Sequence, residues 1–407
     1  MRVLMLAPRA PYPADHGAAL RNLHLLRWLG SRHDVTLFTY GDPENAVVRQ
    51  VLDESARRVE LYPEPRRTLR ERLYTLVRSG EPDLARRLWS APLVLGVQRL
   101  LQNETIELVQ IEGLEMYAIW QDASRGFGGA QPLVVLDDHN AEYELQDSAW
   151  RASLRRGAVF STIYSLIQTS RLRRFERSAG EASDGVLVVS SEDEQSLRAL
   201  GGKLRTAVVP NGVDTTEYQP EPGVREEAAA LFIGKLDYRP NVDAIEWLAR
   251  AIWPRVRELV PQAHLFVVGR DPLPRVRSLA SAPGITVIGP VADDRPWFAR
   301  ASVLLVPMRM GGGVRLKVLQ ALAMGTPLVS TSIGMAGTDA VDESHFLRAD
   351  DPAEFARQTA RVLGDGALRD RLAVEGRRYV CERFDWQVIL PRLDEFYQQI
   401  RSTCQPV

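Results

Sequence analysis

Residues 303–331, VLLVPMRMGGGVRLKVLQALAMGTPLVST, decide the fold. An apolar run of strand length, Val303–Val306, leads through a glycine-bearing loop into a helix-period segment, Val314–Met324, and a second apolar run follows at Leu328–Thr331. A glycine and a proline come directly after the helical segment and end it, as these residues commonly do. A strand, a helix and a second strand in this order predict two parallel strands of one sheet.

The same alternation runs along the whole chain. Short runs rich in Val, Ile and Leu, bounded by polar residues, glycine or proline, predict buried strands, and the segments between them have helical periodicity. The expected strands are 2–7, 34–40, 58–61, 107–112, 133–137 and 186–190 in the first half, and 206–209, 229–233, 264–268, 285–288, 303–306, 328–331 and 346–349 in the second. This pattern predicts an α/β fold with two doubly wound parallel sheets, each covered by helices on both faces.

Composition excludes several classes of protein. The 407 residues are 45% hydrophobic and 25% charged, with a formal net charge of -1, which is typical of a globular protein and argues against general nucleic-acid binding. No apolar run approaches the ~20 residues that a membrane span requires. Only two cysteines occur, Cys381 and Cys404, so a disulfide framework is excluded and a reducing compartment is favoured. We therefore expect a cytoplasmic protein rather than a secreted, fibrous, disordered or integral-membrane one.

Three parts are expected along the chain. The boundary between the two sheets is placed near Gly201–Lys203, before the Pro210-Asn211-Gly212 turn. The expected domains are therefore residues 1–203 and 204–385, and a final helix within 386–407 crosses back to the first domain. Two doubly wound domains that face each other predict a ligand cleft at the carboxyl ends of their strands.

The glycine loop after the strand at 303–306 predicts an anion site. Only three of the 51 basic residues are lysines, and Lys317 is one of them, two positions after Arg315. A helix N-terminus is already positive, so two cations there are unfavourable unless a polyanion binds. Glycines would let a phosphate approach the backbone, while Arg315 and Lys317 neutralise its charge. The alternative is a solvated helix start with a flexible loop.

Two polar loops follow predicted strands of the first half. The loop 11–19, PYPADHGAA, enters a helix at Gly17, and it is not a G-x-G-x-x-G motif, so it is equally well explained as a structural turn. Residues 137–142, DDHNAE, could bind hydroxyl groups or a metal, or transfer protons. Their alternative is a polar loop that caps the next helix. We expect no metal, because no second cluster of acidic residues or histidines has the sequence spacing of metal ligands.

Further strand ends of the second half carry glycine. Gly234-Lys235 follows one strand, Gly269-Arg270 another, and Gly289 comes two residues before Val291 after a third. Several such ends in one domain suit recognition of a base and a ribose by backbone groups, although each alone is weak. In the first half, Arg151–Arg177 carries seven arginines among apolar residues. It predicts an amphipathic helix on the core, with contact to an anionic membrane as the alternative.

In this order, the motifs resemble retaining glycosyltransferases of the GT-B fold, specifically glycosyltransferase family 4. The resemblance covers nearly the whole chain, from the loop that ends at Gly17, through residues 209–214 (VPNGVD) and 234–236 (GKL), to the closing residues 384–386 (FDW). Its most specific part is Val306-Pro307 with the glycine loop and residues 321–331, ALAMGTPLVST. The resemblance implies two Rossmann-like domains facing across a cleft, with a crossing C-terminal helix.

The resemblance implies an enzyme that transfers a sugar from a nucleotide-diphosphate sugar, such as a UDP- or GDP-sugar. The implied acceptor is a sugar or a lipid-linked molecule, and the implied process is synthesis of a cell-surface polysaccharide or glycolipid. No cofactor or metal is implied, because protein cations stabilise the leaving diphosphate. The implied catalytic residues are Arg315, Lys317 and His139. The implied donor-binding residues are Gly17, Ala18, Lys235, Gly269, Arg270, Val291, Gly311, Gly312, Gly313, Val314 and Gln320; on the acceptor side lie Glu112, Asp138, Asn140 and Glu142.

The sequence departs from the family pattern at two positions. Gly312 and Gln320 stand where the family usually has two glutamates, and Gln320 can bond a ribose hydroxyl without supplying charge. This departure motivates an alternative, a catalytically silent protein that binds a sugar nucleotide or a glycan. A third alternative is a sugar-nucleotide epimerase. Its reaction requires acid and base carboxylates, which only Asp137, Asp138 and Glu142 could supply.

Overall fold

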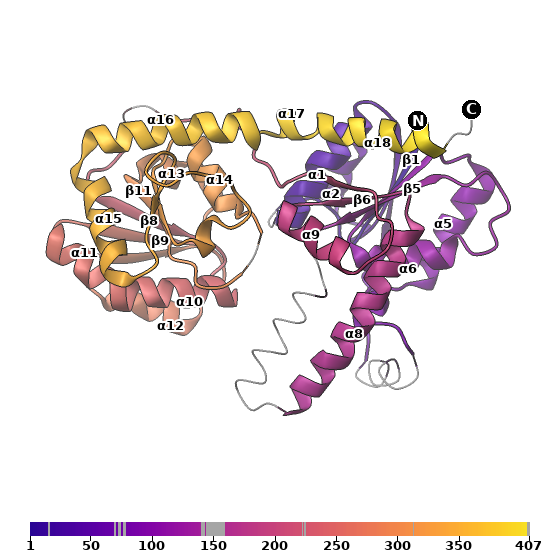
Figure 1. Cartoon of the computed structure of the whole chain (residues 1–407), viewed down its shortest axis with the longest axis horizontal. Coiled ribbons are helices and arrows are strands. Elements are labelled where there is room, and N and C mark those ends of the chain that lie inside the picture. Colours follow the sequence, from indigo (N-terminus) through magenta and orange to yellow (C-terminus); the bar gives the residue numbers. More distant parts are fainter. Residues whose placement is uncertain are drawn as a thin grey trace. The chain divides into compact units, whose positions relative to one another are not determined.

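The computed structural model describes residues 1–14, 17–68, 71, 75, 79–139, 143, 159–221, 223, 225–311 and 313–404. The chain divides into two compact units, one of Met1–Pro210 with Leu390–Val407 and one of Asn211–Ile389. In each unit, helices cover the faces of a parallel sheet (Figure 1). No helix in the described part of the chain is long and apolar enough to cross a membrane.

The first unit is built on a seven-stranded parallel sheet in the order β3-β2-β1-β4-β5-β6-β7. Its order reverses between β1 and β4, and in open sheets of this kind ligands bind outside the carboxyl ends at such a switch point. The strands are β1 (Arg2–Ala7), β2 (Asp34–Tyr40), β3 (Arg58–Tyr62), β4 (Leu108–Glu112), β5 (Leu133–Asp138), β6 (Gly185–Val188) and β7 (Thr206–Val208).

Helices of the first unit connect these strands and cover both faces of the sheet. The apolar side of α1, for example, is buried at Leu25, Leu26 and Leu29, as expected of a helix that packs on a sheet. The helices are α1 (Gly17–Gly30), α2 (Ala46–Asp53), α4 (Asp83–Arg87), α5 (Ala91–Asn103), α6 (Leu114–Ala123), α8 (Val159–Ala182), α9 (Ser191–Ala199) and α18 (Pro391–Cys404).

The second unit is built on a six-stranded parallel sheet in the order β10-β9-β8-β11-β12-β13. Its order reverses between β8 and β11, so the loop after β11 that contains the glycines leaves the sheet beside this switch point. The strands are β8 (Ala229–Ile233), β9 (His264–Val268), β10 (Ile285–Gly289), β11 (Val303–Val306), β12 (Leu328–Ser330) and β13 (Leu347–Arg348).

Every residue of β8 and β11 is buried, in keeping with a sheet covered on both faces. The helices of this unit are α10 (Arg239–Trp247), α11 (Trp253–Leu259), α12 (Pro274–Arg277), α13 (Arg295–Arg300), α14 (Leu316–Ala323), α15 (Pro352–Gly364), α16 (Gly366–Arg383) and α17 (Trp386–Ile389). A π-helical turn, η1 (Leu248–Ile252), joins α10 to α11, and two 3-10 turns are η2 (Ser278–Ser281) and η3 (Ile333–Met335).

The prediction of two doubly wound parallel sheets is confirmed, and three local expectations are corrected. The strand expected at 206–209 in the second domain is β7, which pairs with β6 in the first sheet, so the first unit extends to Pro210. The final helix is broken between Ile389 and Pro391, because proline cannot continue the preceding hydrogen-bond ladder. The helix expected from Val314 begins at Leu316.

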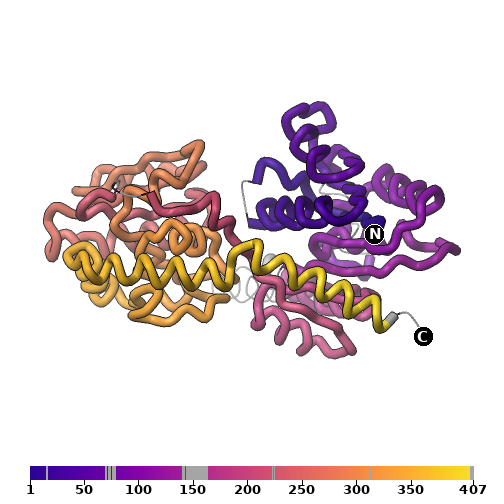
Figure 2. Tube along the Cα trace, turned by 90° about the horizontal axis from the view of Figure 1, so that it is seen from above, coloured from indigo at the N-terminus to yellow at the C-terminus, as the bar shows by residue number. Residues whose placement is uncertain are grey.

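The C-terminal helix α18 belongs to the first unit, in agreement with the expected return of the chain. Figure 2 shows this yellow helix lying along the first unit. Gly185 at the start of β6 makes room for it, because a Cβ atom there would lie 2.4 Å from Cδ1 of Ile400 and 2.7 Å from the ring of Phe396. A glycine in a strand therefore permits the close approach of the helix.

Candidate functional site

In the second unit, the loops after β8, β9, β10 and β11 all leave the same edge of the sheet, because the strands are parallel. This edge collects those residues expected to bind the donor that lie in the second unit. Lys235, Gly269, Arg270 and Val291 follow the first three of these strands, and Gly311, Gly313, Val314, Arg315, Lys317 and Gln320 follow β11. Gly312 lies outside the described residues.

Two glycines let the first two loops approach each other closely. Gly234 and Gly269 have φ angles of +152° and +154°, a region that residues with a side chain rarely adopt. A Cβ atom on Gly269 would lie 1.8 Å from the carbonyl oxygen of Gly234. A Cβ atom on Gly234 would lie 2.9 Å from Nζ of Lys317. The absence of a side chain at Gly234 therefore leaves space for the Lys317 ammonium group.

Lys317 lies in the first turn of α14 and points at the loop after β8. Its Nζ donates to Oδ1 of Asn241 at 3.0 Å and lies 5.0 Å from the centre of the Phe232 ring. Asn241 in turn donates from Nδ2 to the carbonyl oxygen of Lys235 at 3.0 Å, which fixes the orientation of its amide. Burial, and secondarily the charge of Arg315, lower the pKa of Lys317 to about 7.

Arg315 stabilises the glycine loop. It has the extended conformation of an N-cap residue, so it precedes α14 instead of lying in its first turn. Its guanidinium group donates to the carbonyl oxygens of Gly311 and Gly313, both at 3.0 Å. Burial lowers its pKa below the ordinary value. The side chain of the N-cap residue Arg315 makes no capping hydrogen bond, so the amides of the first turn of α14 can donate to an anion.

The remaining predicted cation, Lys235, is less available than Lys317. It is half-exposed, and its Nζ lies 3.3 Å from a carboxylate oxygen of Asp237 and 3.8 Å from one of Asp271. Arg270, beside Asp271, is exposed, and Val291 is half-buried. Lys235 can still move toward a ligand, because exposed ion pairs contribute little free energy.

Gln320 is held by residues that the sequence analysis did not identify. Its Nε2 donates to the Tyr218 hydroxyl at 2.7 Å, and that hydroxyl donates to Oδ1 of Asp294 at 2.9 Å. Burial raises the pKa of Asp294, and the hydrogen bond from Tyr218 opposes this change. One N–H of the Gln320 amide is therefore engaged by protein, and its carbonyl oxygen and second N–H are the groups that can meet a ligand hydroxyl.

In the first unit, the structure brings Glu112 and His139 together at the carboxyl ends of β4 and β5. Nε2 of His139 lies 3.1 Å from Oε2 of Glu112 and 3.9 Å from Oδ2 of Asp137. Asp138 is buried in the last position of β5, while Gly17 and Ala18 begin α1. Asn140 and Glu142 lie outside the described residues.

A buried arginine completes this cluster. Arg21 on α1 is 1% exposed, and it forms a bidentate ion pair with Asp137 at 2.8 and 3.0 Å. It also donates to the carbonyl oxygens of Val209 and Pro210. The sequence contains a signal for Arg21, because it shares a helix face with Leu25 and Leu29, four and eight positions later, where an apolar residue is expected.

The electrostatics of the cluster keep His139 charged more readily than an isolated histidine. Burial alone would lower the pKa of His139, but the hydrogen bond with Glu112 and the charges of Asp137 and Glu112 raise it above the ordinary value. Burial and the neighbouring Asp137 raise the pKa of Glu112, against the effects of His139 and Arg21. This arrangement can donate a proton or a hydrogen bond from the imidazole to a polar ligand.

Glu112, Asp137 and His139 place ligand atoms within 4.8 Å of one another, which is metal-site spacing. Both oxygens of Asp137 accept from Arg21, however, and Oε1 of Glu112 accepts from Gln110. A guanidinium group against one carboxylate repels a divalent cation. The side chains therefore fit a hydrogen-bonded ion-pair network and do not fit a metal ion.

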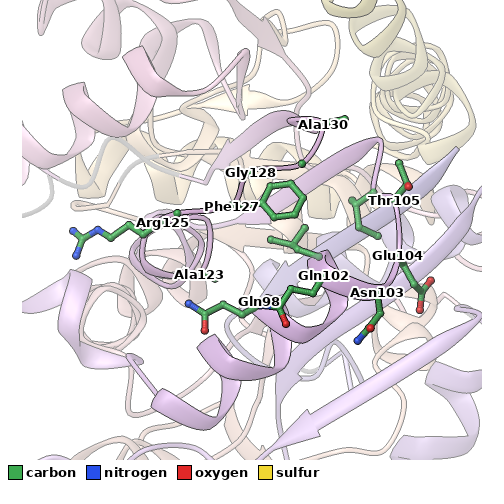
Figure 3. A pocket seen from close by; sticks show the side chains of 14 residues that line it. Gln98, Gln102, Asn103, Glu104, Thr105, Ala123, Arg125, Phe127, Gly128 and Ala130 are labelled. Carbon is green, nitrogen blue, oxygen red and sulfur yellow. The ribbon is translucent and has the colours of Figure 1, made fainter.

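A separate pocket of about 560 Å³ lies near the amino ends of β4 and β5 (Figure 3). Gln98, Gln102 and Phe127 are among the residues that line it. None of the residues expected to bind donor or acceptor lines this pocket. The candidate site is therefore distinct from it.

Two parallel-sheet α/β units, with the C-terminal helix returning to the first, match the GT-B fold. The chain belongs to glycosyltransferase family 4: the family model "Glycosyltransferase Family 4" matches residues 16–217, and "Glycosyl transferases group 1" matches residues 227–365. The family resemblance found in the sequence is thereby confirmed, and with it the assignment as a glycosyltransferase.

The chain is also similar to individual proteins and solved structures. An uncharacterized 44.6 kDa protein in the cps region of Klebsiella pneumoniae is 22% identical over 94% of this chain and 96% of its own length. A GDP-mannose-dependent alpha-(1-6)-phosphatidylinositol monomannoside mannosyltransferase of Mycobacterium tuberculosis is 28% identical over 74% of this chain and 78% of its own. The structure of Anabaena HepE in complex with UDP and glucose has a TM-score of 0.70 and 15% identity, covering 98% of this chain and all of that one.

Proposed function

We propose that the protein is a retaining, metal-independent hexosyltransferase that uses a nucleotide-diphosphate sugar. One observation carries the proposal: two cations, Arg315 and Lys317, lie partly buried at the start of α14, after the glycine loop that follows β11. Among the residues that the structure describes, neither cation forms an ion pair with a carboxylate. Buried charges without a counter-charge are costly, and a bound diphosphate would supply that counter-charge.

The proposed reaction breaks the bond between the sugar C1 and the diphosphate oxygen and forms a bond from the same face of C1 to an acceptor hydroxyl. The hydroxyl proton passes to the departing diphosphate. Arg315 and Lys317 stabilise the negative charge that develops on the leaving group, with Lys235 assisting. Gly311, Gly313 and Val314 offer backbone contact. Gly312, beside them, is assigned to the donor by its position in the sequence.

The base and ribose of the donor are assigned to the other loops of the second unit. Gly269, Arg270 and Val291 would contact the nucleoside, and the free carbonyl oxygen of Gln320 would accept from a ribose hydroxyl. UDP- and GDP-sugars are the proposed donors, since HepE is described in complex with UDP and the mycobacterial relative is named for GDP-mannose. No cofactor is required by this proposal.

The acceptor is assigned to the first unit. His139 would hydrogen-bond a hydroxyl of the donor sugar, and Gly17 and Ala18 would approach it through their backbone. Glu112 and Asp138, with Asn140 and Glu142, would bind the acceptor, a sugar or a lipid-linked saccharide of a surface polysaccharide or glycolipid. The exposed Arg173, Arg174 and Arg177 on α8 support peripheral contact with an anionic inner membrane face.

The test is thermal stabilisation by saturating UDP, GDP and ADP in EDTA, for the wild type and for Arg315→Ala. A nucleotide at ~100 times its Kd stabilises by about 2.7 kcal/mol, which gives a readable shift. We expect UDP or GDP, but not ADP, to raise the melting temperature of the wild type, and Arg315→Ala to lose most of this shift. Stabilisation that survives in Arg315→Ala would contradict the assigned diphosphate site.

A second candidate function is a catalytically silent sugar-nucleotide or glycan-binding protein. The hydrogen bond from Gln320 to Tyr218 favours it, because a neutral, engaged amide stands where the family usually has a glutamate. Incubation with UDP-glucose or GDP-mannose distinguishes the two functions. Release of UDP or GDP, by transfer or slow hydrolysis, supports the enzyme, whereas binding without release supports the silent protein.

A further inference from the structure

The C-terminal helix α18 places a polar group inside the first unit. Tyr397 is 4% exposed, and its hydroxyl donates to Oε1 of Gln110 on β4 at 2.7 Å. Burial raises the pKa of Tyr397 well above its ordinary value, so the hydroxyl keeps its proton and acts as a donor. The two residues are 287 positions apart in the sequence, so this contact exists only because the chain returns to the first sheet.

The bond from Tyr397 determines how the amide of Gln110 is oriented. Because the amide oxygen accepts from Tyr397, the amide nitrogen faces the other way and donates to Oε1 of Glu112 at 2.9 Å. Gln110 and Glu112 are two residues apart on β4, so their side chains lie on the same face of the sheet. Both are fully buried.

Glu112 passes this orientation to His139. As a carboxylate it can only accept hydrogen bonds, so the Nε2 atom of His139, 3.1 Å from its Oε2, must carry a proton. The other charged groups at the ring are Asp137 on β5 and Arg21 on α1, which are paired with each other. Glu112 thus links Gln110 to the ring of His139, and Asn22 on α1, with its amide flipped, donates to the same Oε2 at 2.8 Å.

An apolar pair would be the simpler way to seat α18 on β4. The other members of that strand, Leu108, Val109 and Ile111, are apolar and buried. A buried amide and hydroxyl are tolerated only when each finds a partner. Here the hydrogen-bond partners form a continuous series that ends at His139. A contact that served only to dock α18 on β4 would not require such a series.

We propose that Tyr397 and Gln110 are positioning residues for His139, and that the C-terminal helix orients this histidine through the series Tyr397–Gln110–Glu112–His139. The inference rests on the proposed function in one respect, namely that His139 hydrogen-bonds the sugar. Partners that orient metal-bound histidines change activity by about 10- to 100-fold when removed. We expect a comparable effect, about tenfold on kcat with little change in KM for the donor.

The experiment uses the full chain with ¹⁵N-labelled histidine, and the variants Tyr397→Phe and Gln110→Met. The signal of His139 is assigned by its loss in His139→Gln, and the ring nitrogen shifts are followed from pH 5 to 9 without ligand. Tyr379→Phe is the matched control, because its hydroxyl donates to Asp339 at 2.6 Å in the second unit. Release of UDP from UDP-glucose and of GDP from GDP-mannose gives kcat and KM.

We expect Nε2 of His139 to stay protonated across this range in the wild type and in Tyr379→Phe. Tyr397→Phe and Gln110→Met should both show partial protonation of Nδ1 in the neutral His139 ring and a lower kcat. Unchanged His139 signals in Tyr397→Phe would overturn the proposal. This holds even if the variant melts at a lower temperature, because a loss of stability alone would show only that Tyr397 helps to dock α18. If Gln110→Met does not fold, Tyr397→Phe alone decides.

If the protein does not transfer a sugar, the expected result differs from that of a failed positioning series. In that case no nucleotide is released by the wild type, while the His139 signals still change in the two variants. The histidine measurement contains no substrate, so it tests the positioning series independently of the reaction.

Discussion

Lys317 has two properties that bear on ligand binding, its withdrawal from water and its neutral partner. Asn241 accepts one of the three hydrogen bonds that an ammonium group can donate. Since burial is the main cause of the lowered pKa of about 7, an anion that approaches Nζ must raise that pKa again. Binding of a diphosphate and protonation of Lys317 are therefore linked.

This linkage predicts a pH dependence of nucleotide affinity. Above pH 7 the free protein has lost the Lys317 proton, so UDP or GDP binding must take up a proton and should weaken as pH rises from 7 to 9, by at most about tenfold per pH unit. Titration calorimetry in buffers of different ionisation enthalpy measures the uptake. Lys317→Met should bind about 10- to 100-fold more weakly at pH 7 and show no uptake, whereas Lys317→Arg should bind without uptake.

The same shift has a defined sign for stability. Between pH 7 and the ordinary lysine value of 10.5, the unfolded chain binds a proton that the folded protein lacks. The Lys317 contribution to the free energy of unfolding therefore rises with pH over this window. A difference of the opposite sign between the wild type and Lys317→Met would show that the ammonium group is not desolvated.

Among the elements of the second unit, the loops after β8 and β9 approach each other closely at two glycines. The Gly234 amide donates to the carbonyl oxygen of Val268 at 3.1 Å, and the Gly269 amide donates to that of Gly289 at 2.8 Å. Such backbone contacts hold successive strand ends in register beside the proposed donor site. They require the unusual φ angles that glycine provides.

Gly269→Ala should therefore destabilise the second unit by about 2–4 kcal/mol, since it adds both conformational strain and a clash with the Gly234 carbonyl. Gly289→Ala separates the two effects. Its φ is also positive, at +86°, but its Cβ would meet no atom within 4 Å, so it should cost only about 1–2 kcal/mol. Urea unfolding followed by tryptophan fluorescence compares them, and equal losses would argue against the close approach of the loops.

For the molecule as a whole, one long-range contact along the chain is the packing of the C-terminal helix α18 on the first unit. Tyr397 joins the helix to β4 and Gly185 admits it beside β6. Residues Pro391–Cys404 thus complete the packing of the first unit. The proposed role of His139 depends on this packing.

Gly185→Val should weaken the docking of α18, because the added methyl groups overlap Ile400 and Phe396. Hydrogen exchange read by mass spectrometry should show faster exchange within Pro391–Cys404 and unchanged exchange in the second unit. Gly364→Ala is a suitable control, since a Cβ there would meet no atom within 4 Å. Equal exchange of α18 in both variants would show that Gly185 is not needed for close packing.

Much of this fold was predictable from local patterns. Continuous apolar runs such as Val303–Val306 can be buried on both faces only in a covered parallel sheet, and the helical periods between them supply the cover. The glycine loop with its two cations was identifiable for a similar reason, because local electrostatics disfavour that combination without an anion. The edge of the sheet that carries the site follows from the direction of parallel strands.

The sequence could not place elements whose partners are distant. The strand Thr206–Val208 follows a glycine-rich turn that suggested a boundary, yet it completes the first sheet because β6 offers it an open edge. Arg315 was expected inside a helix, whereas its hydrogen bonds to Gly311 and Gly313 turn it back onto its own loop. These partners lie only two and four positions earlier, so the error at Arg315 concerns the local conformation of the loop and not a distant contact.

The α/β class, the family and the residue types available for diphosphate chemistry follow from periodicity and short motifs, so the amino-acid order is enough to predict them. Tertiary structure alone decided which side chains meet: Lys317 with Asn241, Arg21 with Asp137, and Tyr397 with Gln110. The physical reason is that a buried polar group must find its partner wherever the packed chain brings one.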